Sequence, residues 1–521
     1  MSMARFIFYF FKNTILIFIF IALYIGFAFL TYRHYGLTMD EFFVYARGKY
    51  FYTKVRGNDK FLQKGFVVNE GRNQDLLYNN SSYPALLYAV NDGETYEGYH
   101  LLNLLIAASI FYLFYEVLLY LYKKPFLALV GPVFLLFTPR FFGDIPANPK
   151  DIPFAILYFA TLVVIFFSKT WNEKLRILIV GILIGLTSSI RLLGIFLLPV
   201  YFLYQLTTSF LQEKMIMRDF IINTILGSFL IFLIAFLIFI FNMPYVGADP
   251  FNHTLELLNV NKNYPWFGDI LHFGKTYSIY TRPQTYLFIW ILITTPLFVL
   301  VLSPITLFKK MVGEKKSIIM LVWISLLFQI FLYLVLRPVI YNGIRHYVFL
   351  IPHLVLLASI SFIELLANRK FKYVVVFLVA INFFVVTKFY VSYHPYEYIY
   401  FNELVGGVKG ATGNFEVDYW AASDKEALTW LSDYLTKNNI QKPKIATCSK
   451  SATLGYYLPE AKDYNNKMKK ADYIVCYDGV LKNKIEKIPG STLIHTVTRD
   501  DVPFNYVYKI EHLKLKEIKG D

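Results

Sequence analysis

Residues 220–243 read FIINTILGSFLIFLIAFLIFIFNM and contain no Asp, Glu, Lys or Arg. A helix needs about 20 consecutive apolar residues to cross the hydrocarbon core of a bilayer, and this stretch is long enough. Further apolar runs of this kind lie at 14–32, 101–122, 125–138, 152–168, 177–190, 192–210, 286–308, 317–336, 347–366 and 373–390. The sequence therefore predicts a mainly α-helical polytopic membrane protein with about 11 transmembrane helices.

The composition agrees with this class. Of the 521 residues, 56% are hydrophobic and 17% are charged, and the mean hydropathy is +0.47. A soluble domain carries about 25% charged residues. In a soluble protein, the net charge of +15 would suggest a nucleic-acid partner. Most of the excess lies in short loops between apolar runs, so we expect membrane lipids and no nucleic acid as partners.

The basic loops predict how the chain is oriented, because cytoplasmic loops are enriched in Lys and Arg. With eleven spans, the basic loops all fall on one side. They hold Arg5 and Lys12; Lys123 and Lys124; Lys169, Lys174 and Arg176; Lys214 and Arg218; Lys309, Lys310, Lys315 and Lys316; and Arg369, Lys370 and Lys372. This predicts a cytoplasmic N-terminus and an extracytoplasmic C-terminus.

The long segments 33–100, 244–285 and 391–521 then lie outside. The first contains EFFVYARGKYFYTKV (41–55), whose apolar residues recur at helical spacing with basic residues between them. This pattern predicts a helix in the plane of the interface; an ordinary solvated helix is the alternative. Residues 1–390 are expected to form the membrane domain.

Residues 391–521 are expected to form a small extracytoplasmic α/β domain. KIATCSK (444–450) and ADYIVCYDG (471–479) read as buried strands, and 424–437 has helical patterning. Each strand-like segment holds one of the two cysteines, Cys448 and Cys476, and they lack metal-ligand spacing. They can face each other and oxidise, but two small buried apolar side chains is the favoured interpretation.

Asp40 and Glu41 follow the first span within a few residues. A carboxylate at a membrane surface near apolar walls can be tuned to act as a general base. The alternative is structural, because TMDE before an apolar run also fits a helix N-cap at Thr38 or Asp40.

The predicted outer turn PRFFGDIPANPKDIPFA (139–155) brings Arg140, Asp144, Lys150 and Asp151 into one short connection. Ionisable residues at membrane depth are costly and usually functional. An Asp cap on the following helix and a snorkelling Lys form the alternative interpretation.

Arg191, Arg345 and His346 also lie at predicted outer ends of spans, against the positive-inside pattern. With Lys150 they can converge on an anion, and phosphate is the natural one, since Arg binds it bidentately and Lys as a point charge. Each residue taken singly also fits interface anchoring.

Several motifs carry a resemblance to a known enzyme class. They are the acidic pair Asp40 and Glu41, NPKDIPF (148–154), SSIRLLGI (188–195), YPWFGDILHFGKTY (264–277), ITTP (293–296), YNGIRH (341–346) and YFNELVGGVKGATGNFEVDYWAAS (400–423). The order of these motifs, and the side of the membrane on which each is predicted to lie, resemble those of GT-C membrane glycosyltransferases, specifically family 39. That family includes protein O-mannosyltransferases and lipid A aminoarabinose transferases. The last two motifs look like a bacterial branch, which implies the bacterial plasma (inner) membrane.

The resemblance implies an inverting transfer of a sugar from a polyprenyl-phosphate donor to a hydroxyl of a lipid, glycan or protein on the outer face. Asp40 would then be the base, and Glu41 would position it. Arg140, Lys150, Arg191, Arg345 and His346 would lie on the phosphate side, and Asp151 would orient Lys150 or the acceptor. No dense carboxylate cluster is present, so we expect no metal and no other cofactor, although some GT-C enzymes use a divalent ion.

Two other classes of function remain open. A transporter or flippase of lipid-linked sugars predicts internal repeats, broken helices and ionisable residues deep in the spans, whereas the charges here cluster at outer ends. A non-catalytic scaffold would leave the acidic pair and the cationic turns without a role.

Overall fold

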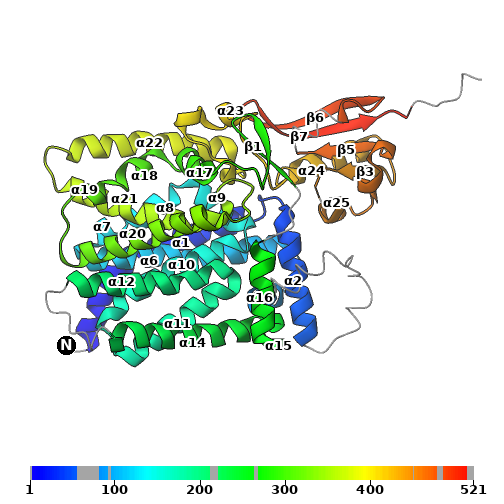
Figure 1. Cartoon of the computed structure of the whole chain (residues 1–521). Helices are drawn as coiled ribbons and strands as arrows, with labels where there is room; N and C mark the ends of the chain where they lie inside the picture. Colours follow the sequence, from blue (N-terminus) through cyan, green and yellow to red (C-terminus); the bar gives the residue numbers. More distant parts are fainter. Residues whose placement is uncertain are drawn as a thin grey trace, which may run out of the picture.

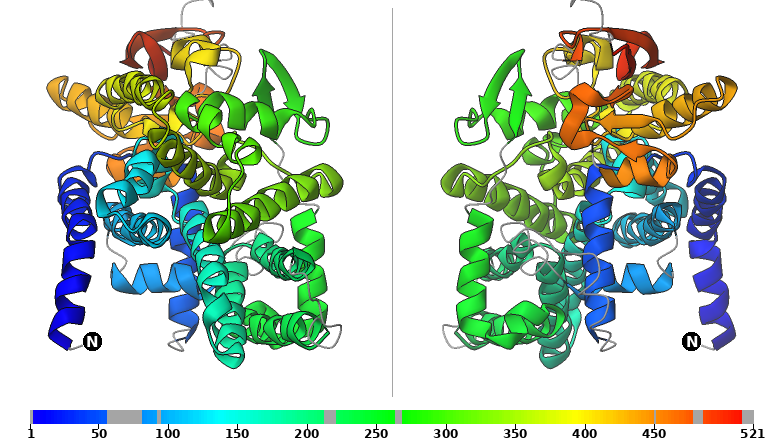
Figure 2. Two further views of the ribbon diagram at one scale, coloured as in Figure 1. Left: turned by 90° about the vertical axis from the view of Figure 1, so that its left-hand side faces the viewer. Right: turned by 90° about the vertical axis from the view of Figure 1, so that its right-hand side faces the viewer.

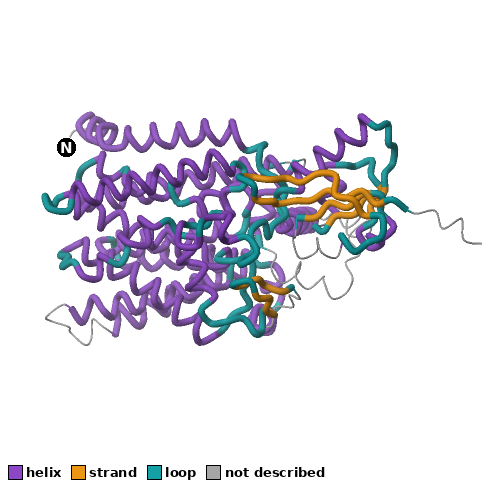
Figure 3. Tube along the Cα trace, turned by 90° about the horizontal axis from the view of Figure 1, so that it is seen from above, coloured by secondary structure: helices purple, strands orange, loops and turns teal. Residues whose placement is uncertain are grey.

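Apolar runs form long helices that lie side by side in one bundle. The structure, a computed structural model, describes residues 3–55, 81–91, 95–211, 221–262, 268–449, 451–477 and 485–512. The bundle consists of α1 (Met3–Thr31), α6 (Tyr96–Tyr122), α10 (Asp151–Phe167), α11 (Glu173–Ile190), α12 (Leu197–Leu211), α14 (Gly227–Asn242), α20 (Gly313–Leu336), α21 (Ile351–Leu366) and α22 (Lys372–Tyr393). The axes of these helices are roughly aligned with one another, and a sheet lies beyond one end of the bundle, opposite the N-terminus (Figure 1, Figure 3).

Shorter helical elements complete the bundle. They are α7 (Pro125–Ala128), α8 (Val130–Leu136), α9 (Pro139–Ala147), α17 (Tyr286–Thr294), α18 (Leu297–Leu302) and α19 (Ile305–Phe308), the 3₁₀ helices η1 (Ser168–Thr170), η2 (Leu192–Phe196) and η4 (Arg345–Leu350), and the π-helical η3 (Ile221–Leu226). The predicted loop with Lys214 and Arg218 lies outside the described residues.

Within the described residues, eight helices are long and apolar enough to cross a membrane, or up to ten if each of two bent helix pairs is one span. The sequence predicted about eleven such spans. The remaining predicted run, 177–190, lies in α11, which has 18 residues and carries Glu173, Lys174 and Arg176 in its first turns. These charges make α11 more polar than the other long helices.

Two predicted spans are bent. Pro125–Leu136 and Pro139–Ala147 meet at 68°, and Tyr286–Thr294 and Leu297–Phe308 meet at 114°. A proline follows each break, and the residue before a proline avoids the helical region. Thr138 and Thr295 accordingly have non-helical backbone angles. The tight turn predicted after the run 125–138 is therefore itself a helix, α9, and all its residues are buried.

Asn402 closes the break before Pro296. Its side-chain amide donates hydrogen bonds of 2.7 Å to the carbonyls of Leu292 and Thr295, and its backbone N–H donates to Ile293 at 2.8 Å. Backbone groups inside a membrane must be satisfied by the protein itself. The segment after α22 thus supplies the partners that the bent helix lacks.

Two helices near the sheet run across the bundle rather than along it: α2 (Met39–Val55) and α16 (Pro250–Lys262) (Figure 1, Figure 2). The helix predicted at 41–55 is therefore confirmed, and its direction is the one expected of a helix lying in an interface plane. Around these helices lie α5 (Ser82–Val90), α15 (Pro244–Ala248) and the hairpin β1 (Asp269–His272) and β2 (Lys275–Ser278). The rest of the first outer loop, 56–80 and 92–94, is outside the described residues.

The C-terminal part contains a five-stranded sheet of order β4-β3-β5-β7-β6. Its elements are η5 (Glu397–Ile399), η6 (Glu403–Val405), α23 (Gly407–Ala411), α24 (Asp424–Lys437), β3 (Lys444–Thr447), α25 (Ser451–Tyr457), β4 (Lys462–Asp463), η7 (Asn465–Lys470), β5 (Tyr473–Cys476), β6 (Ser491–Arg499) and β7 (Val502–Ile510). The predicted strands and the helix at 424–437 are confirmed. Apolar side chains of α24 and α25 pack on one face of the sheet.

Cys448 and Cys476 form a disulfide. The favoured interpretation of two unbonded apolar cysteines is therefore wrong. β3 and β5 are parallel neighbours that pair Thr447 with Val475, so the next residue of each strand faces the other, with 4.8 Å between the Cα atoms. A disulfide is typical of oxidising compartments, which agrees with the predicted outer location of this domain.

The predicted orientation can be tested with single cysteines, because both native cysteines are bonded to each other. Asp433 on α24 and Val312 before α20 are both exposed. We expect Asp433→Cys to react with an impermeant thiol reagent added outside spheroplasts, and Val312→Cys to react only after lysis. Protection of position 433 in intact spheroplasts, with labelling of position 312, would contradict the orientation.

Candidate active site

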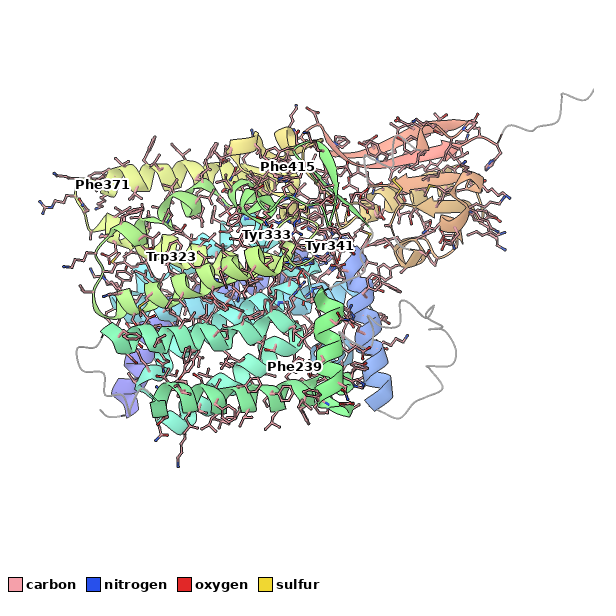
Figure 4. All side chains as sticks on the ribbon, in the orientation of Figure 1. Phe239, Trp323, Tyr333, Tyr341, Phe371 and Phe415 are labelled. Atoms are coloured by element: carbon pink, nitrogen blue, oxygen red, sulfur yellow. A yellow bond between two sulfur atoms is a disulfide. The ribbon has the colours of Figure 1, made fainter. Side chains whose placement is uncertain are left out.

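A cavity of about 1450 Å³ lies where the membrane helices meet the C-terminal part. Its described lining comes from α2, the 148–151 turn, residues 190–196, α16, the β1–β2 hairpin, residues 336–347, residues 412–420, Tyr477 and residues 503–506. Tyr341 and Phe415, which both line it, lie toward the sheet end of the bundle, whereas Phe371 lies at the opposite end (Figure 4). The cavity therefore lies at the end of the bundle that is predicted to face outward.

One face of α2 forms a wall of this cavity. Asp40, Phe43, Val44 and Arg47 all line it, and their spacing of i, i+3, i+4 and i+7 places them on one side of a helix. The sequence reading singled out Asp40 but missed Arg47, which is buried. Its position seven residues after Asp40 was the available signal.

Arg345 lies between two carboxylates. Its Nη1 is 2.5 Å from Asp40 Oδ2, and its Nε is 3.8 Å from Asp151 Oδ2. The guanidinium also lies over the ring of Trp420, 5.8 Å from the centroid. The turn before it is tightly packed, because a Cβ at Gly343, which has φ +68°, would come within 2.9 Å of Trp290. This packing fixes where η4 begins and thus the position of Arg345.

Asp151 holds a second cation. It forms an ion pair with Arg191, which follows the last residue of α11. Asn148 accepts a hydrogen bond from the Asp151 backbone N–H at 2.9 Å and donates to its carboxylate at 3.2 Å. The side chain of Asn148 thus supplies the capping acceptor at the start of α10, so Asp151 is not needed as the cap of that helix. Asp151 is left to bind Arg191 and face Arg345.

Lys150 and His346 also line the cavity. The His346 ring meets the edge of Tyr341, with 4.7 Å between the ring centroids. The cavity therefore collects six of the eight residues singled out from the sequence. They are Asp40, Lys150, Asp151, Arg191, Arg345 and His346.

Glu41 does not face the cavity. It is buried, accepts hydrogen bonds from the Thr38 backbone N–H at 2.7 Å and hydroxyl at 3.0 Å, and pairs with His100 at 2.7 Å. The carboxylate on the Thr38 N–H is one half of a capping box. These contacts agree with the capping alternative at Thr38, and the expected role of Glu41 in positioning Asp40 stays a prediction.

Arg140 is also absent from the described lining. It is fully buried and donates to the Tyr398 carbonyl and, at 2.6 Å, to the Tyr419 hydroxyl. Both donors thus bind the segment that follows α22. Arg140 thus ties α9 to the cavity wall at Tyr419, and its expected place on the phosphate side stays a prediction.

Asp418, Tyr419 and Trp420 form a wall that the sequence reading did not single out. Burial raises the pKa of the Asp418 carboxyl, although hydrogen bonds from Ser423 and Tyr398 favour its charged form. No spacing signal marked these residues, because they follow no apolar run or turn pattern. The only hint was their place inside the long 400–423 motif.

Part of the cavity wall is apolar. It consists of Ile190, Leu192, Leu193, Ile195, Phe196, Leu258, Leu336, Val339 and Ile340. Ile190, Leu192 and Leu193 are sequence neighbours of Arg191, and all nine residues line the cavity that the cations line, so cations and apolar side chains share one space. A ligand with an anionic group beside a hydrocarbon chain matches such a surface.

Across the described ranges, no group of three or more His, Cys, Asp or Glu side chains is arranged to hold a metal ion. The expected independence of metal remains a prediction.

Solved structures show which fold this is. The structure of ArnT from Cupriavidus metallidurans bound to undecaprenyl phosphate superposes with a TM-score of 0.53 at 12% identity, over 95% of this chain and 98% of that one. The chain has a GT-C fold. The apo form of the same ArnT gives a TM-score of 0.48 at 11% identity, over 94% and 97% of the two chains.

No known protein family matches the sequence, and no curated protein does. ArnT belongs to family 83 of the GT-C class. At 12% identity the likeness shows the fold alone, and membership of family 39 stays a prediction. With its apolar helices and this fold, the chain is an integral, multi-pass membrane protein.

Proposed function

We propose that this protein is an inverting glycosyltransferase that takes a sugar from a polyprenyl-phosphate donor and gives it to a hydroxyl group on the outer face of the bacterial plasma membrane. One observation carries the proposal. The carboxylate of Asp40 and the cations Lys150, Arg191 and Arg345 share a cavity with an aliphatic wall. The fold, which ArnT shares, adds support, because that enzyme was solved with undecaprenyl phosphate.

The donor end of the cavity is the part around Arg191. Lys150, Arg191 and Arg345 would bind the phosphate, and the aliphatic side chains of η2 would contact the first isoprene units. Binding to cations favours the phosphate as a leaving group, since it stabilises the charge that develops as the sugar departs. No acid is then required to protonate an alkoxide.

Asp40 is the proposed base. The acceptor oxygen attacks the anomeric carbon, the bond from that carbon to the phosphate oxygen breaks, and the electron pair leaves with the polyprenyl phosphate. The hydroxyl proton passes to the Asp40 carboxylate. A single displacement of this kind inverts the anomeric centre.

Exposure distinguishes Asp40 from Asp151. The Asp40 side chain is 34% exposed, whereas that of Asp151 is 3% exposed and holds Arg191. A base must reach the acceptor hydroxyl, which favours Asp40. Arg345 now pairs with Asp40 at 2.5 Å; a bound phosphate competes for this guanidinium and leaves the carboxylate available to the acceptor.

The donor class can be tested with purified protein and a panel of sugars on polyprenyl phosphate, each compared with the matching nucleotide sugar. We expect transfer only from the lipid-linked donors. One charge-assisted hydrogen bond to phosphate contributes about 1.5–3 kcal/mol, so Lys150→Ala and Arg191→Ala should each lower kcat/KM by about 10- to 100-fold.

Lys150→Arg should restore activity only in part, because the two cations differ in shape. Transfer from a nucleotide sugar without lipid would contradict the donor class. Full activity of both alanine variants would leave Lys150 and Arg191 as interface anchors.

A flippase of lipid-linked sugars is the second candidate, and the two bent helix pairs are the observation that favours it. The two functions differ in their products. A flippase returns the donor unchanged in the other leaflet, whereas the transferase releases polyprenyl phosphate and a glycosylated acceptor. Mass spectrometry of the lipid extract from reconstituted vesicles separates them.

A further inference from the structure

The residues that connect α1 to α2 are held from the C-terminal part of the chain. This linker, residues 33–39, ends directly before Asp40. Lys425 on α24 donates its ammonium hydrogen bonds to the carbonyls of Arg33 and, at 3.2 Å, Tyr35. The backbone of the linker is thus bound at its first half by a helix of the C-terminal domain.

The second half of the linker is bound in the same way. The Leu37 N–H donates to the Tyr457 hydroxyl of α25 at 2.9 Å. The Met39 N–H donates to the Trp420 carbonyl at 3.1 Å. These two bonds fix the backbone on either side of Thr38, within three residues of the proposed base.

The contact is also close in space. A Cβ at Gly36 would overlap the carbonyl oxygen of Ala422, so the two backbones touch and only glycine fits there. Near Gly36 in the linker, the Nδ1 atom of His34 lies 2.7 Å from the Nε2 atom of His394. His394 is the first residue after α22. Within the membrane domain, the Thr38 hydroxyl donates to the Ala147 carbonyl at 3.1 Å, and the His34 N–H donates to the Thr31 carbonyl at 2.8 Å.

We propose that Tyr457 and Lys425 are positioning residues for Asp40, and that the C-terminal domain acts in transfer by holding the linker at the mouth of the cavity. This inference rests on the proposed function of Asp40. Misplacement of a reacting group by about 1 Å can lower a rate by about 10²-fold, so backbone bonds that fix Met39 bear directly on turnover.

The inference predicts a selective loss of turnover. Tyr457→Phe removes the hydroxyl that accepts the Leu37 N–H, and it should lower kcat by about 3- to 10-fold while the KM for the lipid donor stays unchanged. Combined with Lys425→Met, the loss should reach about 30- to 100-fold. Lys425→Arg instead of Lys425→Met, combined with Tyr457→Phe, should recover part of the rate, because Arg can donate to the same carbonyls.

Tyr434→Phe is the matched control. Tyr434 lies on α24 and stacks on Trp430 within the same domain. This variant should keep wild-type kcat and KM. A fall in kcat equal to that of Tyr457→Phe would mean that any hydroxyl loss in the domain has this effect, and would overturn the specific role of Tyr457.

Hydrogen–deuterium exchange gives a readout that does not depend on activity. Tyr457→Phe should speed exchange in the peptide that contains Leu37 and Met39, and Tyr434→Phe should not. Unchanged exchange, or a variant that acts only by raising the donor KM, would overturn the inference. If wild-type protein transfers no sugar from any donor, the proposed function fails, whereas the exchange result still decides whether the domain holds the linker.

Discussion

Asp40→Asn is expected to lower turnover by about 10²- to 10⁴-fold, the range that general base catalysis contributes. Asn has nearly the same size but cannot accept the proton of the acceptor hydroxyl. Asp40 lies in the first turn of α2, where loss of the carboxylate weakens the interaction with the helix dipole by only about 0.3–1 kcal/mol, so the protein should still fold and insert. The measurement is kcat with a saturating lipid-linked donor.

The matched control is Asp433→Asn on α24, an exposed carboxylate that is not among the described cavity-lining residues. It should retain full activity. The KM for the donor should change little in Asp40→Asn, because the phosphate is bound by other residues. Turnover of Asp40→Asn within a few-fold of wild type would exclude Asp40 as the base and leave it as the ion-pair partner of Arg345.

The membrane bundle was predictable because a bilayer imposes a simple condition on sequence. Runs such as 220–243 can be recognised without any knowledge of their neighbours. The bends were not recognised, although Pro296 and Pro139 stood in the sequence. Whether a proline kinks a span or ends it depends on partners for the freed carbonyls, and Asn402, more than a hundred residues away, supplies them at Pro296.

The charged part of the site was also accessible from sequence. Ionisable residues at membrane depth are costly, so Lys150, Arg191 and Arg345 were conspicuous beside apolar runs. Arg47 and Asp418 were not, because each lies in a polar segment where one more charge carries no signal. Their places on the cavity wall follow from the packing of α2 and of the 412–420 segment.

Residues of the same charge that the sequence pointed to face different surroundings in the structure. Asp40 and Glu41 are adjacent, yet helical geometry turns them about 100° apart, so Asp40 lines the cavity while Glu41 faces Thr38 and His100. Arg140 has the charge of a phosphate ligand, but its guanidinium donates hydrogen bonds to the Tyr398 carbonyl and the Tyr419 hydroxyl. A sequence gives residue types, and only tertiary contacts decide which of them remain available to a substrate.

Arg345→Ala is expected to lower kcat/KM by about 10²- to 10³-fold and also to destabilise the protein. The guanidinium lies 2.5 Å from Asp40 and 3.8 Å from Asp151. Its removal takes away a phosphate ligand and leaves two carboxylates in one cavity without the cation between them. Arg345→Lys should recover part of the activity, since it restores the charge without the planar fork. The measurements are kcat/KM and the thermal midpoint in detergent.

Arg282→Ala is the control for this substitution. Arg282 donates to the carbonyls of Pro338 and Ile340, each at 3.2 Å, and is not among the described cavity-lining residues. It should cost stability but little activity.

Combining Arg345→Ala with Asp40→Asn gives a further test, because residues that act as one unit have non-additive effects. If the phosphate draws Arg345 away from Asp40 in the productive complex, the two residues act on different groups there, and the double variant should lose at least the sum of the two single losses in free energy. A double variant that loses little more than the worse single variant would mean that the two residues act as one unit, and an Arg345→Ala variant with near-normal kcat/KM would exclude the guanidinium from the donor site.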